Sequence, residues 1–274
     1  MSVCSRLFTV FMSAENLEGR THTVRPYGLS KPEIARISFK SLWLALNQSY
    51  LPSWRLVASD NSSSEEFRAW MHKHSRAHLA PDGVPIYPTP SYEQREQEIQ
   101  RILGLEAATD DQWLLLAEDD QLWSGDALYL LRDFIETYSG DYVLVPYIQP
   151  YLIWAGLTEH QSGPEIESRE VLSMDFLRAR EKPRLWARSR LHHWMQVFWT
   201  NGTLLIRVGL LRKWWAENPG KSVLEHHFME KKAETVPFFA PIPSLSTHFQ
   251  EGCESPGFNQ RVTEEWVRSF LRHD

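Results

Sequence analysis

The hydrophobic residues of this chain gather in short continuous runs, and segments with helical periodicity lie between them. Residues 7–12 (LFTVFM) and 113–117 (WLLLA) are apolar at nearly every position, which is typical of strands buried on both faces of a sheet. Shorter or weaker runs indicate the other strands. We expect these at 55–59, 84–87, 142–146 and 202–208.

Apolar residues at three- and four-residue spacing fill the gaps between these strands and predict amphipathic helices. The sequence Ser30-Lys31-Pro32-Glu33 has the form of a capping box with proline in the first turn, and it predicts a helix over 31–48. Ser222 is expected to cap a helix at 223–232. Further helices are expected at 65–74, 91–104, 125–138, 209–216 and 263–272. Strands alternating with helices predict an α/β fold, with a mostly parallel mixed sheet flanked by helices on both faces.

Length and charge narrow the classes of function. A chain of 274 residues suits a single domain over 1–274, with one half over about 1–125 and a second over about 126–274. The net charge of −6 argues against a general nucleic-acid binder, which would be basic. Cys4 and Cys253, the two cysteines, can neither form a disulfide framework nor hold zinc alone.

The sequence also indicates in which compartment of the cell the protein is expected. The longest apolar stretch, 142–157, is interrupted by Pro146, Gln149 and Pro150, so we expect no transmembrane segment. The N-terminus lacks the charged and apolar regions of a signal peptide. We therefore expect a cytoplasmic protein. The arginine-rich strip over 176–193 leaves peripheral attachment to a membrane open.

Three consecutive acids, Glu118-Asp119-Asp120, come directly after the 113–117 strand. Repulsion and partial burial would raise their pKa values unless a cation lies among them. Oxygen ligands of this kind suit Mg²⁺ or Mn²⁺, which share their remaining positions with phosphate oxygens and water. A solvated turn whose acids stabilise the start of the 125–138 helix is the alternative interpretation. Asp60 ends the 55–59 strand in the same way, and ligands of parallel sheets bind at such strand ends.

When the acidic residues are considered together with other segments of the sequence, the chain resembles the nucleotide-sugar-dependent glycosyltransferases of the GT-A fold, especially the large inverting family 2 group. Four stretches carry the resemblance: residues 7–48, RLVASDNSSSEEF, WLLLAEDDQLWSGDALYLL, and VFWTNGTLLIRVGLLRKW followed by SVLEHHFMEK. Their order and spacing are more specific than any one of them.

The resemblance implies roles for individual residues. Asp120 matches the metal-binding Asp of the acidic motif, and Asp119 or Glu118 would be its partner. Asp60 matches the Asp that contacts the nucleotide base or ribose. Glu225 matches the acid that opens the acceptor-side helix and acts as general base; an ordinary helix-start Glu is the alternative.

The resemblance also implies the ligands. The donor would be a UDP- or GDP-type sugar, the cofactor Mn²⁺ or Mg²⁺, and the acceptor a glycan, a lipid-linked sugar or another hydroxyl compound, as in polysaccharide biosynthesis. His248 is a candidate second metal ligand, since some GT-A enzymes use a histidine near the C-terminus; a structural histidine is the alternative. Independently of the resemblance, the arginine-rich strip offers Arg190, with Arg184 and Arg188, as a candidate diphosphate clamp; a solvated charged face is the alternative.

The chain departs from the family in places. The acidic motif begins with Glu rather than Asp, and Arg101-Ile102-Leu103-Gly104 lacks the family's Asn. A sugar-nucleotide nucleotidyltransferase is a rival, although residues 13–20 contain a single Gly where that class has a Gly-rich loop. A non-catalytic carbohydrate-binding protein is another rival, given 12 Trp. A metal-dependent hydrolase would need His-Glu-x-x-His spacing, which is absent from the sequence.

Overall fold

A computed structural model describes residues 7–13, 26–49, 54–61, 63–78, 83–89, 94–147, 185–198, 202–248 and 264–272. The strands of this part of the chain are β1 (Leu7–Ser13), β2 (Trp54–Asp60), β3 (Ile86–Pro88), β4 (Trp113–Glu118), β5 (Gln121–Trp123), β6 (Val143–Leu144), β7 (Trp186–Arg188), β8 (His193–Val197), β9 (Leu204–Arg207), β10 (Phe238–Ile242) and β11 (Ser246–His248). The helices are η1, a short 3₁₀ turn (Pro26–Gly28), α1 (Lys31–Gln48), α2 (Glu65–His78), α3 (Arg95–Leu105), α4 (Ala127–Thr137), α7 (Val208–Glu217), α8 (His226–Lys232) and α9 (Glu264–Ser269).

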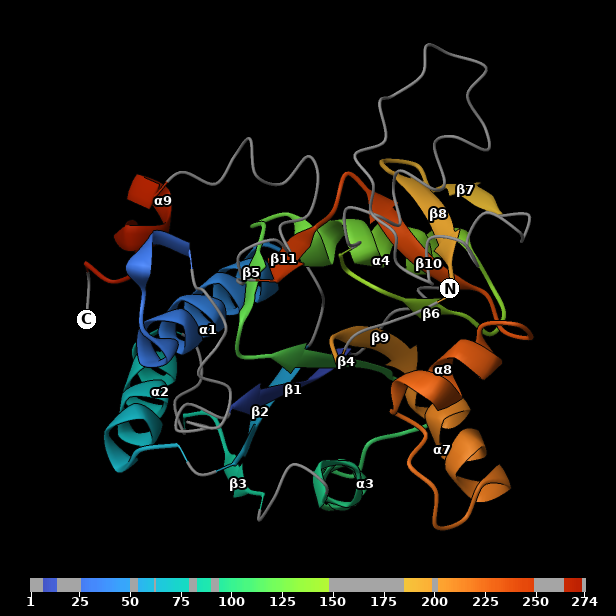
Figure 1. Cartoon of the computed structure of the whole chain (residues 1–274), viewed down its shortest axis with the longest axis horizontal. Coiled ribbons are helices and arrows are strands. Elements are labelled where there is room, and N and C mark those ends of the chain that lie inside the picture. Colours follow the sequence, from blue (N-terminus) through green and yellow to red (C-terminus); the bar gives the residue numbers. More distant parts are fainter. Residues whose placement is uncertain are drawn as a thin grey trace.

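Nine strands form one sheet in the order β3-β2-β1-β4-β9-β6-β10-β8-β7 (Figure 1). β1 pairs in parallel with β2 and β4, while β9 pairs antiparallel with both β4 and β6. β6 and β10 are parallel again, and β8 runs antiparallel to both β10 and β7. Only β8 and β9 therefore run against the common direction among the described strands of this sheet. The expected mostly parallel mixed sheet is confirmed.

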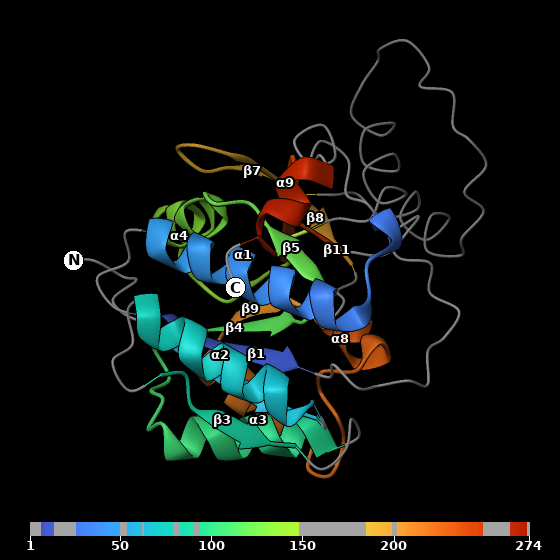
Figure 2. The same ribbon diagram turned by 90° about the vertical axis from the view of Figure 1, so that its left-hand side faces the viewer.

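Helices cover both faces of the sheet (Figures 1 and 2). Alternating residues of β1 show the division: Leu7 and Phe11 pack in one apolar cluster with α1, α2 and α4, and Phe8 and Val10 pack in a second cluster with α3, α7 and α8. Side chains of successive strand residues face opposite sides, so a strand covered on both sides has to be apolar throughout. This is the physical reason for the continuous apolar runs in the sequence.

A second, two-stranded sheet lies beside the N-terminal half of the molecule. β5 follows the acidic residues of the β4 end, and it pairs antiparallel with β11 from near the C-terminus. The backbone N–H of Trp123 in β5 donates to Ser41 Oγ of α1 at 3.2 Å, and that of Ser124 donates to the Leu245 carbonyl at 3.0 Å. The C-terminal part of the chain is thereby brought to residues Glu118, Asp119 and Asp120, which we call the acidic turn.

Most predicted elements are present with small shifts at their ends. The helix predicted at 31–48 is α1, and its Ser30–Glu33 capping box is formed on both sides. The strand predicted at 142–146 is only two residues long, because β6 meets its neighbours over Val143–Leu144 alone. β5, β7, β8, β10 and β11 were not predicted. Residues 14–25 and the first half of the arginine-rich strip, residues 176–184, lie outside the described residues.

The predicted cap of the 223–232 helix is wrong. α8 begins at His226, with Glu225 as its N-cap residue. Ser222 does not cap it, because its hydroxyl donates instead to the Glu96 carboxylate of α3. Among the described helices, none is both long enough and apolar enough to cross a bilayer.

Candidate active site at the carboxyl end of β4

The acidic residues lie where β4 leaves the sheet. Glu118 is the last residue of β4, and Asp119 and Asp120 form the tight turn into β5. The Asp119 side chain is 7% exposed, whereas that of Asp120 is 31% exposed. The next strand, β5, belongs to the second sheet, so the chain leaves the main sheet here with three carboxyl groups at the end of β4.

Two of the acids are paired with cations from other elements. Lys31, the first residue of α1, forms an ion pair with Asp119. Arg95, the first residue of α3, lies 3.6 Å from Glu118 Oε1. The Thr203 hydroxyl accepts the Glu118 backbone N–H at 3.1 Å. The turn is therefore held from both faces of the sheet.

The third acid, Asp120, faces a histidine from the far end of the chain. The β5–β11 register places His248 opposite Gln121, and His248 Nε2 lies 3.1 Å from Asp120 Oδ2. Asp120 Oδ1 is buried and has no hydrogen-bond partner among the described residues. The sequence singled out Asp120 and His248 as metal ligands, and the fold brings these two side chains together.

The site pushes the pKa values of neighbouring carboxyl groups apart. Burial, together with the charge of Asp120, raises the pKa of Glu118 above its ordinary value, and Arg95 opposes this only in part. Burial would also raise the pKa of Asp120, but the charge and hydrogen bond of His248, together with the charge of Lys31, outweigh it and lower that pKa. Asp120 is therefore held in its charged form more firmly than Glu118, as a cation ligand has to be.

The side chains at the end of β4 fit a divalent cation that is bound jointly by the protein and by a substrate phosphate. Among the described residues, no three His, Cys, Asp or Glu side chains are grouped as a metal site held by the protein alone would need. The open acceptor Asp120 Oδ1 and the imidazole of His248 would supply two ligands, the imidazole after losing the proton that it shares with Asp120. Mg²⁺ characteristically takes one or two carboxylates and completes its shell with substrate phosphates and water.

Asp60 lies at the same edge of the sheet. β1 pairs with β2 on one side and with β4 on the other, with Ser13 opposite Asp60 and Met12 opposite Glu118. At roughly 4.8 Å per strand spacing, Asp60 and Glu118 are about 10 Å apart. Asp60 is buried, and its Oδ1 accepts the Ser13 hydroxyl at 2.7 Å.

Glu225 lies at the start of α8. Its side chain is exposed and makes no capping hydrogen bond, although it occupies the N-cap position of α8. No interaction within the described part of the chain joins it to Glu118, Asp119 or Asp120. The predicted position at the start of a helix is present, and its role as a base stays a prediction.

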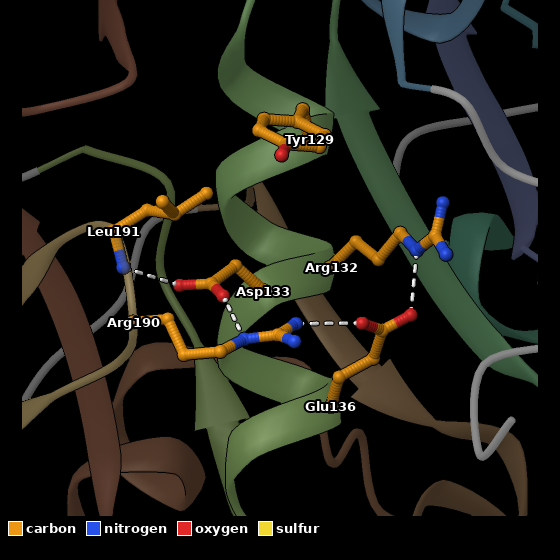
Figure 3. A pocket seen from close by; sticks show the side chains of 6 residues that line it. All are labelled: Tyr129, Arg132, Asp133, Glu136, Arg190 and Leu191. Carbon is orange, nitrogen blue, oxygen red and sulfur yellow. Dashed lines mark hydrogen bonds and ion pairs between the residues drawn. The ribbon is translucent and has the colours of Figure 1, made fainter. Parts of the chain in front are cut away.

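Arg190 contacts helix α4 rather than the acidic turn. Its Nε donates to Asp133 at 2.9 Å and its Nη2 donates to Glu136 at 2.7 Å, both on α4 (Figure 3). These residues line a surface pocket of about 330 Å³ with Tyr129, Arg132 and Leu191. The described interactions of Arg190 include none with the acidic turn, so the predicted diphosphate clamp finds no support in its contacts. Arg184 lies outside the described residues.

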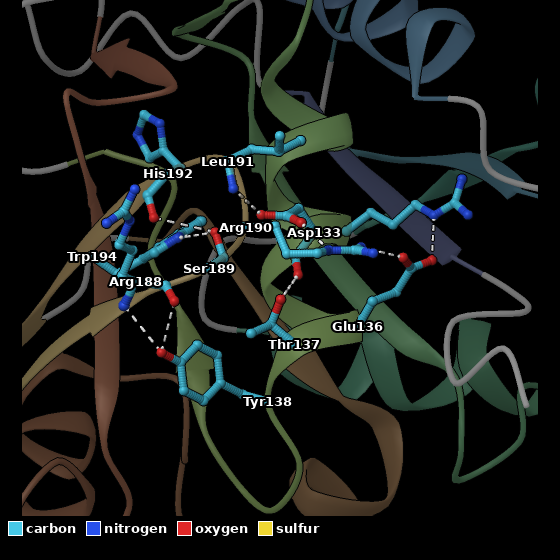
Figure 4. Close-up of polar contacts among 11 residues, drawn as sticks. Asp133, Glu136, Thr137, Tyr138, Arg188, Ser189, Arg190, Leu191, His192 and Trp194 are labelled. Atoms are coloured by element: carbon cyan, nitrogen blue, oxygen red, sulfur yellow. Dashed lines mark hydrogen bonds and ion pairs between the residues drawn. The ribbon is translucent and has the colours of Figure 1, made fainter.

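The tryptophans near this region fill the core. Trp194 and Trp214 are among the largest fully buried side chains, and the indole N–H of Trp194 donates to Ser189 Oγ at 3.0 Å (Figure 4). They are therefore not exposed for stacking on a sugar. Trp199 lies outside the described residues.

Sequence reasoning missed three residues that shape the site. Lys31 and Arg95 each begin a helix that is distant in sequence from the acids they pair with. Gly202, just before β9, lies so close to Glu118 that a Cβ there would overlap the carboxylate. The signals were a lysine directly after a capping serine and a glycine just before a strand, and neither identifies a partner.

Comparisons with known proteins give likenesses of fold only. No family model matches the chain, and no curated protein matches it. The solved structures that resemble it include residues 1–349 of TarS from S. aureus, 14% identical, with a TM-score of 0.45 over 85% of this chain. The chain spans 57% of the length of that fragment.

Two further structures resemble nearly the whole chain. The inositol-1-phosphate CTP transferase from T. maritima is 12% identical, covering 98% of this chain and 96% of its own, with a TM-score of 0.42. The galactosyltransferase LgtC, solved with donor and acceptor sugar analogues, is 12% identical, covering 97% of this chain and all of its own, also with a TM-score of 0.42. With every TM-score below 0.5, these likenesses do not establish a shared function.

Proposed function

We propose that this chain is a glycosyltransferase that moves a sugar from a nucleoside-diphosphate sugar to an acceptor hydroxyl. The observation that carries the proposal is the pairing of Asp120 with His248 at the carboxyl end of β4, where Asp120 Oδ1 lacks a hydrogen-bond partner among the described residues. Asp60 at the end of β2 adds a buried carboxylate to the same sheet edge, about 10 Å from Glu118 by strand spacing.

In this proposal the two ends of the donor have separate partners. Asp60 contacts the base or ribose, and Asp120 and His248 hold Mn²⁺ or Mg²⁺, with Asp119 or Glu118 beside them. When bound, such an ion stabilises the charge that develops on the departing diphosphate. Lys31 and Arg95 already balance Asp119 and Glu118, so the site is not left with three uncompensated acids.

Glu225 is the proposed general base. The acceptor oxygen attacks the sugar C1 as the bond from C1 to the diphosphate oxygen breaks, and the hydroxyl proton passes to the Glu225 carboxylate. Attack opposite the leaving group inverts C1, as in the family 2 enzymes that the sequence resembles. The exposed Glu225 side chain, free of a capping bond, is accessible to an acceptor from solvent.

Thermal unfolding of the full chain with nucleotides tests the proposal. The panel is UDP, GDP, UDP-sugars and GDP-sugars, each with and without Mn²⁺. A ligand that binds only the folded state raises the midpoint of unfolding. We expect one nucleotide to raise it in a metal-dependent way, and Asp120→Ala to abolish that rise. A panel without any nucleotide-dependent rise would contradict the proposal.

A nucleotidyltransferase is the second candidate, since the same strand-end acids suit that chemistry. The distinguishing ligand is the nucleoside triphosphate. The second candidate predicts that CTP or UTP raises the midpoint of unfolding, and that incubation with a sugar phosphate releases pyrophosphate and forms a nucleoside-diphosphate sugar. If both results are obtained, the second candidate is correct.

A further inference from the structure

The first two residues of α3 bind two different parts of the candidate site. Arg95 pairs with Glu118 of the acidic turn. The next residue, Glu96, binds residues 222–224, which directly precede Glu225. We propose that Glu96 is a positioning residue that fixes Glu225 relative to the acidic turn. That Glu96 holds residues 222–224 in place follows from geometry alone. That this affects catalysis rests on the proposed function of Glu225.

The Glu96 carboxylate is saturated with donors. Its Oε1 accepts the backbone N–H of Val223 at 2.9 Å and the indole N–H of Trp215. Its Oε2 accepts the Ser222 hydroxyl and, at 3.4 Å, the backbone N–H of Leu224. A carboxylate offers about four acceptor sites, and all are used here. Glu96 is only 7% exposed, and a buried charge with this many donors holds them firmly in place.

These bonds constrain the backbone on one side of Glu225, and α8 constrains it on the other. The Glu225 carbonyl accepts the Met229 N–H at 3.0 Å, which starts the helix. Val223 and Met229 are both buried in the apolar cluster that covers this face of the sheet. Glu225 itself is exposed and has no capping bond. An exposed acid on a fixed backbone can be aimed at an incoming acceptor, and Arg95 ties the same turn of α3 to the acids.

The same helix supplies a matched control. Glu98 is 8% exposed, and it pairs with Arg101 of α3 rather than with the loop. Glu96→Gln and Glu98→Gln therefore remove the same charge from equally buried positions on one helix. Only the first takes the carboxylate away from Ser222 and Leu224.

Amide hydrogen exchange of the full chain tests the structural part without any substrate. We expect Glu96→Gln to speed exchange across residues 222–232, and Glu98→Gln to leave that segment as in the wild type. Equal exchange in all three proteins would overturn the inference. If Glu96→Gln does not fold, Trp215→Phe and Ser222→Ala each remove one donor and should speed exchange in the same segment.

Hydrolysis of UDP- and GDP-sugars tests the catalytic part. Misplacement of a catalytic group by about 1 Å costs on the order of 10²-fold in rate, so we expect Glu96→Gln to lower kcat by about that factor while leaving the donor KM and the nucleotide-dependent thermal shift unchanged. In a Glu225→Gln background, Glu96→Gln should lower kcat no further, because the group it positions is already disabled.

The two failures are distinguishable. An equal loss of kcat with and without the Glu225 carboxylate would overturn the positioning role while the proposed function stands. A wild-type protein with neither a nucleotide-dependent shift nor donor hydrolysis would contradict the proposed function. In that case the exchange comparison still decides whether Glu96 holds the segment before Glu225.

Discussion

Gly202 and Glu118 illustrate how closely single residues are fitted in the acidic turn. The backbone of Gly202 leaves no room for a Cβ beside the Glu118 carboxylate. Glu118 is also paired with Arg95 and has its backbone N–H bound by Thr203, so its side chain has few other places to go. The lack of a side chain at residue 202 is thus part of the geometry of the site.

We predict that Gly202→Ala displaces the Glu118 side chain and weakens binding of nucleotide with Mn²⁺. Overpacking of this kind costs about 1–3 kcal/mol of unfolding free energy, and urea unfolding measures it. The rise in thermal midpoint caused by nucleotide and Mn²⁺ should be smaller than in the wild type. An unchanged rise would show that the Glu118 position does not matter for binding.

Gly104→Ala is the matched control for that prediction. Gly104 lies in α3 with open space where a Cβ would be. Replacing a helical glycine by alanine stabilises by about 0.5–1 kcal/mol, so we expect a small gain in stability and no change in ligand binding.

Some residues of the site could be predicted from the sequence around them, whereas others owe their role to contacts with residues far away in the sequence. Asp120 could be found because three acids after an apolar strand are unusual by themselves, and His248 through the family resemblance. Lys31, Arg95 and Glu96 could not, because nothing near them in sequence shows that they meet Asp119, Glu118 and residues 222–224. Those contacts exist only once β4 is paired within the sheet and α1 and α3 are packed on its two faces.

The same distinction between local and distant contacts explains which helices and strands could be predicted. α1 was predicted to the residue because its cap and its apolar period are both local. β5 and β11 are each three residues long and are strands only because they pair with one another across nearly half of the chain. The Ser222 prediction failed because a buried carboxylate from α3 competes for its hydroxyl.

The capping box of α1 supports the helix that carries Lys31. Ser30 Oγ accepts the Glu33 N–H at 3.4 Å, and Glu33 Oε2 accepts the Ser30 backbone N–H at 2.7 Å. We predict that Ser30→Ala lowers the unfolding free energy by about 1 kcal/mol, measured by urea unfolding. Ser30→Asp should retain most of the stability, and equal losses in the two variants would show that the cap is not the cause.

Asp133 of α4 anchors the turn between β7 and β8. It accepts the backbone N–H of Leu191 and the guanidinium of Arg190 (Figure 4). Burial would raise the pKa of Asp133, but hydrogen bonds from Ser189, Leu191 and Arg190 outweigh it and lower that pKa below its ordinary value. The charged carboxylate therefore contributes stability above a pH of about 4, and this contribution is lost as the pH falls through the lowered pKa.

We predict that Asp133→Asn lowers the unfolding free energy by about 2 kcal/mol at neutral pH, because hydrogen bonds to charged groups are worth about 1.5–3 kcal/mol each. The difference from the wild type should shrink as the pH falls below about 4. Glu136→Gln, which removes the more exposed partner of Arg190, should cost less than about 1 kcal/mol. A loss for Asp133→Asn that does not vary with pH would contradict the account.

At the scale of the molecule, one sheet joins the two halves expected from the sequence. β9 pairs with β4 and β6, so the strands that carry Asp60 and the acidic turn are continuous with those of the C-terminal half. The β5–β11 sheet adds a second connection. We predict one cooperative unfolding transition in calorimetry, with equal calorimetric and van't Hoff enthalpies. Two separable transitions would contradict the single domain.

The central claim is that Asp120 and His248 form a metal site completed by a nucleoside diphosphate. Electron paramagnetic resonance of free Mn²⁺ measures this directly, in the presence of the diphosphate that gives the larger thermal shift. We predict that the wild type removes free Mn²⁺ beyond what the diphosphate alone removes, whereas Asp120→Asn and His248→Ala bind Mn²⁺ with a Kd at least tenfold higher, about 1.4 kcal/mol in binding free energy. Equal Mn²⁺ binding by the wild type and both variants would contradict it.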